Sequence, residues 1–214
     1  DDTDTDMQPD MVWIKNREQA LNWMMFDTVR GITKYFYSNL TEAEGTSSSI
    51  LTAIGSDGFT VGANNNVNQS SNDIVAYCWK ESATSGFDMV AYTGNGTDDT
   101  DISHSLSAVP KLIIVKNRDA ADAWQVYHGA NTAAPETDYL VLNTMAATAD
   151  AADRWSDEAP TSSVFTLGDA DEVNTNTEDY IAYLFAPKQG FSAMGSWVGN
   201  GNASGPFIYT GFKP

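Results

Sequence analysis

The sequence predicts an all-β protein made of two tandem β-sandwich domains of the jelly-roll or lectin-like type, related by internal duplication. Three observations lead to this prediction. Short apolar runs recur about every 10 residues, and clusters of Gly, Asn, Asp, Ser and Thr separate them. Long helical periodicity is nearly absent. The third observation is that the same series of motifs occurs twice. One larger jelly roll made from both copies is the alternative architecture.

The expected elements follow in chain order. Apolar runs typical of strands are MVWIK (11–15), WMMF (23–26), KYFYSN (34–39), GFTVG (58–62), DIVAYCW (73–79) and FDMVAYTG (87–94). Turn residues fill the segments SDG (56–58), GANNN (62–66), TGNGTDD (93–99) and GNGNASG (199–205). Short helices are expected at 41–45 and within the Ala-rich segment 144–155.

The duplication is indicated by matched motifs that keep their order. The offset is 101 for Pro9 and Pro110, for Lys15-Asn16-Arg17 and Lys116-Asn117-Arg118, and for Trp23 and Trp124. It is 106 for FTVG (59–62) and FTLG (165–168) and for DIVAYCW (73–79) and DYIAYLF (179–185), and 105 for YTGNG (92–96) and WVGNG (197–201). The offset changes only in loops, as a duplication requires.

The motifs predict domains at 1–108 and 109–214, but they leave the phase of the repeat open. Cuts near 85 and 189 fit the motifs as well. DDTD at 1–4 recurs at 98–101, and Pro214 stands where Pro9 and Pro110 stand. We therefore expect the chain to be part of a longer array.

Composition excludes several classes of function. The 29 acidic residues outnumber 11 basic ones, giving a net charge of -18, whereas a nucleic-acid binder needs a basic face. No apolar run approaches the roughly 20 residues of a membrane helix. One cysteine, Cys78, and two histidines cannot build a disulfide framework or a zinc site.

Several motifs together resemble a repeat module in large virion proteins of marine tailed bacteriophages, such as tail fibres and tail-associated proteins. The motifs are PDMVWIKNR, FDTVRGITKY, SDGFTVG, VAYCWK, YTGNG, PTSSVFTLG and GPFIYTGF. The resemblance implies a virion or extracellular location and a non-catalytic structural or adhesive role. The partners it implies are other virion subunits, further copies of the repeat, and a host surface glycan or protein. A bacterial surface adhesin or surface-layer module and a polysaccharide depolymerase are the alternatives.

The candidate ligand site lies around Trp155, in the polar segment ADRWSDEAP. An exposed Trp between charged residues is typical of a sugar-stacking platform, so Trp155, Arg154 and Asp157 are the predicted ligand-binding residues. The alternative is that Trp155 plugs the end of the sandwich.

Acidic loops offer the candidate metal site. Carboxylates are the ligands that Ca²⁺ prefers, and no other cofactor is expected. The spacing in 168–179 fits a calcium loop poorly, so solvated turn acids are the alternative. The candidate metal ligands are Asp98, Asp99 and Asp101 in one loop and Asp169 and Asp171 in the other.

Nothing in the motifs predicts an enzyme. Neither His104 nor His128 lies in a catalytic pattern, and no GxSxG elbow is present. Most of the acids lie in polar turns, where nothing raises their pKa. The repeated Lys-Asn-Arg motif could form a cationic clamp, but a strand end followed by a polar turn is the simpler interpretation.

Overall fold

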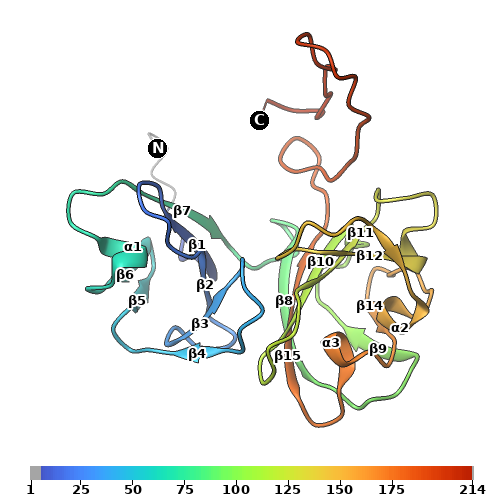
Figure 1. Cartoon of the computed structure of the whole chain (residues 1–214), viewed down its shortest axis with the longest axis horizontal. Coiled ribbons are helices and arrows are strands. Elements are labelled where there is room, and N and C mark those ends of the chain that lie inside the picture. Colours follow the sequence, from blue (N-terminus) through green and yellow to red (C-terminus); the bar gives the residue numbers. More distant parts are fainter. Residues whose placement is uncertain (1–5, 214) are drawn as a thin grey trace.

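The structure, a computed structural model, describes residues 6–213, so the DDTD stretch at 1–4 and Pro214 lie outside the described residues. Antiparallel strands and single-turn helices build the chain, which confirms the predicted all-β class. Figure 1 shows two units side by side, the first coloured blue to teal and the second green to orange. Within residues 6–213, no helix has the length and apolar character needed to cross a membrane.

The first unit packs a five-stranded sheet against a two-stranded hairpin. Along β1, Val12 and Ile14 point into the unit while Met11 and Trp13 point to the outer face, as strand alternation requires. The sheet order is β4 (Gly45–Thr46), β3 (Lys34–Tyr37), β2 (Met24–Asp27), β1 (Met11–Asn16) and β7 (Ile74–Trp79). The hairpin is β5 (Leu51–Gly55) and β6 (Gly58–Val61), followed by α1 (Asn65–Asn68). The buried core residues are Val12, Ile14, Met24, Phe26, Ile50, Leu51 and Val67.

The second unit has one more strand in its large sheet. The order is β13 (Ala149–Asp150), β12 (Asp138–Val141), β11 (Gln125–His128), β10 (Leu112–Asn117), β15 (Asp179–Phe185) and β8 (Phe87–Thr93). β14 (Val164–Leu167) pairs with β9 (Thr100–Ser103) in a small sheet, and the helical turns are η1 (Pro135–Thr137), α2 (Ala152–Trp155) and α3 (Asp171–Asn174). Its core includes Leu106, Val115, Tyr127, Phe165, Leu167 and Tyr180.

Strand pairing assigns residues 87–103 to the second unit. β8 pairs with β15 over seven residues, and β9 pairs with β14. A boundary at 108/109 separates strands of the same sheets, so that predicted boundary does not follow the structure. The alternative cut near 85 leaves every sheet within one unit. The motifs leave the phase of the repeat open because a sequence motif does not show which strands pair.

The matched motifs occupy corresponding places in the two large sheets. By the motif match, β1, β2, β3 and β7 correspond to β10, β11, β12 and β15, and the two sets of strands have the same order in their sheets. The Lys-Asn-Arg motif builds the same turn twice, because the side-chain oxygens of Asn16 and Asn117 each accept two N–H groups of the following loop. Each Arg faces an acid, in the pairs Arg17–Asp73 and Arg118–Glu44. The Lys-Asn-Arg motif therefore fits the interpretation of a strand end followed by a polar turn.

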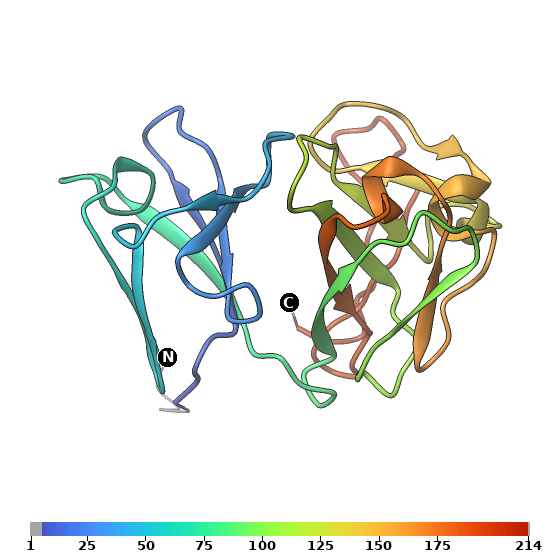
Figure 2. The same cartoon turned by 90° about the horizontal axis from the view of Figure 1, so that it is seen from below.

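The outer faces of the two large sheets pack on each other (Figures 1 and 2). Met11, Met25 and Phe36 of the first sheet form one buried cluster with residues of the second sheet. Trp124 is fully buried there, with its ring centroid 5.2 Å from that of Phe36. Its indole N–H donates to the carbonyl of Leu40 at 3.0 Å, so Trp124 joins the two units.

The two expected helices are mostly absent. Residues 41–44 have no regular structure and lead into β4, so the helix expected at 41–45 is wrong. In the segment 144–155 only the last turn, α2, is helical. Short Ala- and acid-containing segments do not form helices alone because helix nucleation is unfavourable.

Candidate functional site

Trp155, predicted to present an open ring to a ligand, is buried. Its exposed fraction is 2%, and its ring packs edge-on against Tyr127 with centroids 6.1 Å apart. The turn α2 directs Trp155 and Arg154 inward and leaves Asp153 exposed. The prediction of an exposed platform at Trp155 is therefore wrong. The burial of Trp155 in the second unit fits the alternative, in which its ring plugs the end of the sandwich.

Arg154 and Asp157 do not form a ligand surface with Trp155. The Arg154 guanidinium pairs with Asp153 at 2.8 Å and with Glu172 at 3.1 Å, and it lies 4.9 Å above the ring of Tyr139. Its charge is thus balanced within the fold. Asp157 is exposed, on backbone in the left-handed region.

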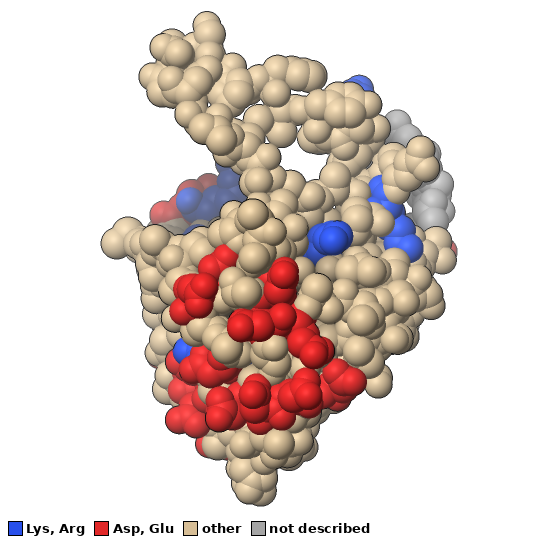
Figure 3. All heavy atoms as spheres, turned by 90° about the vertical axis from the view of Figure 1, so that its right-hand side faces the viewer, with Lys and Arg blue, Asp and Glu red and all other residues tan. Residues whose placement is uncertain are grey.

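The predicted metal ligands lie at exposed positions, with Asp101 in β9, Asp171 at the start of α3 and the other three in loops. Asp98 accepts a hydrogen bond from Ser156 at 2.6 Å, and Asp101 accepts one from Thr166 at 3.0 Å. Asp99 is exposed, and Asp169 and Asp171 border an open acidic hollow that also contains Asp122, Asp153, Arg154 and Glu172. Figure 3 shows acidic side chains gathered on this side of the molecule. Across residues 6–213, no three His, Cys, Asp or Glu side chains lie close enough to hold a metal ion.

Four aromatic rings lie together on the outer face of the first sheet. We call Trp13, Trp23, Tyr77 and Trp79 the aromatic shelf. Tyr77 is 47% exposed and the other three are half-buried. The ring centroids of Trp23 and Trp79 lie 6.3 and 6.2 Å from that of Tyr77, and both ring planes lie within 28° of its plane.

The shelf is accessible because the second unit covers only part of this face. By the motif match, the four positions correspond to Ile114, Trp124, Tyr183 and Phe185. Tyr183 is fully buried against the first unit, whereas Tyr77 is the most exposed member of the shelf. The same strand pattern thus gives a packed surface in one unit and an open one in the other.

A hollow of about 150 Å³ lies beside the shelf, bordered by Trp13, Trp23, Ser38, Asn39 and Leu142. The Trp13 indole N–H donates to the Ser38 hydroxyl at 3.0 Å, and the Trp23 main-chain N–H donates to the Asn39 side-chain oxygen at 3.0 Å. The first bond orients the Trp13 ring, the second anchors the Trp23 backbone, and the polar side chains involved border the same hollow as the two rings. An apolar ring face with convergent polar groups is what binding an amphipathic ligand requires.

A buried ion pair in the first unit is hydrogen-bonded to the large sheet of the second unit. Asp27 accepts from the Arg30 guanidinium at 2.6 Å and from the Tyr183 hydroxyl at 2.7 Å, and both charged side chains are fully buried. Burial acts to lower the pKa of Arg30, but Tyr183, Asp27 and Glu44 hold that pKa above its ordinary value. Glu44 also binds Arg118 at 2.9 Å, which links the units a second time.

The carboxyl of Glu81 has a raised pKa. Burial, together with the hydrogen bond and charge of Asp88, raises the pKa of Glu81 to about 7. Asp88 is 3% exposed and accepts the main-chain N–H of Ser105. A glycosidase needs its two carboxyls roughly 5 to 9.5 Å apart to admit the sugar. Two carboxyls in direct hydrogen-bond contact leave no such space.

A family model described as Domain of unknown function (DUF7483) matches residues 2–214. The chain belongs to the DUF7483 family. Neither a search of curated proteins nor a search of solved structures found a match to the chain. The function of this DUF7483 chain must therefore be argued from its own residues.

The aromatic shelf of the DUF7483 chain could not be identified from the sequence, because the pattern of its residues is typical of a buried core. Trp23 matches Trp124, and Trp79 matches Phe185, so both look like repeated core positions. Strand alternation places Tyr77 and Trp79 on the outer face of the sheet and Cys78 on the inner face. It does not show whether another unit covers the outer face.

Proposed function

We propose that this chain is a non-catalytic structural and adhesive module of an extracellular phage appendage such as a tail fibre, and that the aromatic shelf binds host surface glycan. The observation that carries the proposal is the open shelf beside a hollow bordered by Ser38 and Asn39. The phage setting rests on the sequence resemblance. Other virion subunits and further copies of the repeat are the partners that this setting implies.

The shelf suits a sugar because a pyranose ring has an apolar face of C–H groups and an edge of hydroxyls. The faces of Trp23 and Tyr77 would accept the C–H groups, and the Ser38 and Asn39 side chains lie where hydroxyls would be. The acidic surface favours a neutral or cationic glycan over an anionic one.

The geometry favours binding over cleavage. Glu81, whose pKa is raised to about 7, contacts Asp88 directly and lacks the spacing of a glycosidase pair. A depolymerase is therefore the weaker candidate.

The proposal is tested with immobilised envelope polysaccharides from marine bacteria. Tyr77→Ala should weaken binding about tenfold, because one stacking face is lost. Tyr209→Ala is the matched control, since Tyr209 is 83% exposed and lies outside the shelf. Circular dichroism should show both variants folded. Equal binding by wild type and Tyr77→Ala would contradict the proposal, as would a lack of binding across a broad panel.

A further inference from the structure

The strand β7 has a free edge where its counterpart β15 has a neighbour. β15 lies between β10 and β8, whereas in the described chain β7 pairs only with β1. The difference appears in burial, since Ala182 and Tyr183 are fully buried and the matching Ala76 and Tyr77 are exposed. β7 carries no charge and no proline, the residues that commonly protect an edge strand from pairing with another strand.

Residues 190–201 repeat the sequence of β8 and its turn. Gly190-Phe191 matches Gly86-Phe87, and Gly199-Asn200-Gly201 matches Gly94-Asn95-Gly96. The backbone matches as well: φ is 77° at Gly190 and 75° at Gly86, and 66° at Gly201 and 65° at Gly96. The segment therefore already has the turns that border β8.

This segment forms no strand in the chain. Within the described range, residues 193–213 make no main-chain to main-chain hydrogen bond. Phe191, Trp197 and Val198 are 67%, 65% and 89% exposed. Exposed apolar side chains on backbone without partners indicate a segment that can bind elsewhere.

The first unit contains a socket for the Gly-Asn-Gly turn. In the second unit, Asn174 accepts the N–H of Asn95 on its side-chain oxygen and the N–H of Gly96 on its main-chain oxygen. Asn68 occupies the matching place in α1, and its amide donates to Gly62 just as that of Asn174 donates to Gly168. Asn68 is exposed, so its oxygens are accessible to such a turn.

Docking of the Gly-Asn-Gly turn in this socket would require a residue without a side chain at position 199, and Gly199 meets that requirement. At Gly94, an added Cβ would collide with the main-chain oxygen of Thr175, so only glycine fits. At Gly199 an added Cβ meets nothing within 4 Å. The free chain does not require glycine there, whereas a docked turn would.

We propose that residues 191–201 of one copy add as an antiparallel edge strand to β7 of a second copy. The pairing of β8 with β15 sets the register, which places Phe191 opposite Trp79 and Ser192 opposite Cys78. Residues 191–198 are one longer than the matching 87–93, and a β-bulge near Gly195 accommodates the extra residue. The contact is heterologous, so repeating it extends a chain of copies.

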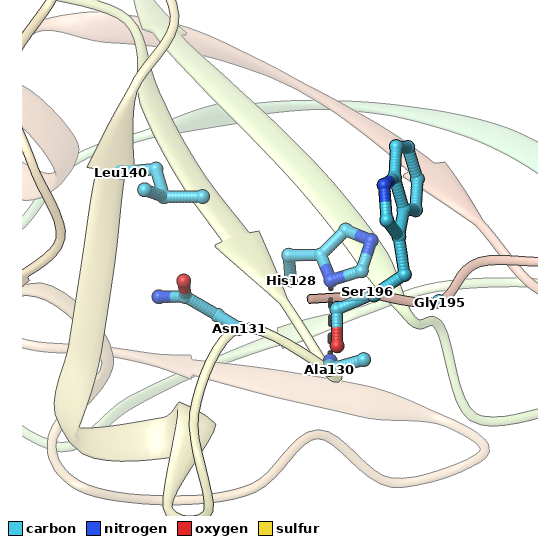
Figure 4. Close-up of a pocket in the computed structure, with 7 residues that line it drawn as sticks. His128, Ala130, Asn131, Leu140, Gly195 and Ser196 are labelled. Carbon is cyan, nitrogen blue, oxygen red and sulfur yellow. Dashed lines mark hydrogen bonds between the residues drawn. The ribbon is translucent and has the colours of Figure 1, made fainter. Parts of the chain in front are cut away.

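The path of the segment favours a second copy over the segment's own β7. Main-chain bonds between Lys188 and Ser192 close a turn after β15. The chain then passes over the second unit, where Trp197 borders a hollow with His128 and Leu140 (Figure 4). Figures 1 and 2 both show this segment on the side of the second unit rather than along β7.

The native cysteine provides the test. Ser192→Cys places a thiol opposite Cys78, so mild oxidation with diamide should give a disulfide-linked species of twice the 23.2 kDa chain mass and longer ladders. Ala193→Cys is the matched control, because its side chain points to the other face. Adding Cys78→Ser to Ser192→Cys should abolish the ladder. A cross-linked monomer would show docking on the same chain, and no specific cross-link would show no docking. Either result overturns the proposal.

A second pair of variants tests the turn. In the Ser192→Cys background, Gly199→Leu should reduce cross-linking to the level of the Ala193→Cys control. Gly205→Leu should leave cross-linking unchanged, since Gly205 also has free space around it and matches Thr100, which carries a side chain. Equal cross-linking in the two leucine variants would overturn the proposed docking of the turn.

Discussion

The buried Asp27 carboxylate should be among the most sensitive positions in the chain. It binds the Arg30 guanidinium at 2.6 Å, the Arg30 main-chain N–H at 2.8 Å and the Tyr183 hydroxyl at 2.7 Å. Asp27→Ala removes all three bonds and leaves a buried guanidinium with Glu44 as its remaining ion-pair partner. Breaking a buried pair by removing one partner costs about 3–5 kcal/mol.

Urea unfolding followed by tryptophan fluorescence measures this loss, because Trp124 lies in the same interface. The matched control is Asp73→Ala, which breaks an exposed pair with Arg17 at 3.6 Å. That variant should change the free energy of unfolding by less than about 0.5 kcal/mol. A loss below about 1 kcal/mol for Asp27→Ala would show that the buried ion pair does not stabilise the fold.

Three further predictions follow from burial and charge. The pKa of Glu81 is raised from 4.5 to about 7, so its contribution to stability is full below pH 4.5 and is lost as pH rises through 7. Glu81→Gln should therefore raise the melting temperature at pH 8 and not at pH 4. An equal change in melting temperature at both pH values would contradict the pKa shift. Trp155→Ala should cost about 3–5 kcal/mol in urea unfolding, and unchanged stability would show that the ring is not a core plug. Chelation with EDTA should leave the melting temperature unchanged, because no three-ligand cluster exists within 6–213, and a drop would reveal a metal site.

Local pattern was enough to predict several of the strands, but not the short strands β4, β9 and β13 or the hairpin strand β5. The runs at 11–15, 23–26 and 73–79 became β1, β2 and β7 within about one residue, because alternating apolar residues between turn clusters have few other ways to bury their side chains. The helix expected at 41–45 is wrong, whereas the segment 144–155 contains the single helical turn α2. A single turn depends on tertiary contacts that the local sequence does not contain.

The candidate sites could not be predicted in the same way. Trp155 has polar neighbours in sequence, yet α2 turns it into the core, so local polarity gave the wrong exposure. Tyr77 and Tyr183 occupy matched positions in matched strands and differ from 47% to 0% exposed. Their difference depends on how the two units pack and on which strand has a neighbour, and neither follows from the pattern of one copy.

The central claim is that this chain binds a surface glycan without cleaving it. The most direct measurement incubates the purified chain with envelope polysaccharides and follows bound protein and new reducing ends in the same sample. We predict saturable binding to at least one polysaccharide, weakened about tenfold in Tyr77→Ala, with no increase in reducing ends. New reducing ends that depend on the chain would contradict the claim and identify a depolymerase.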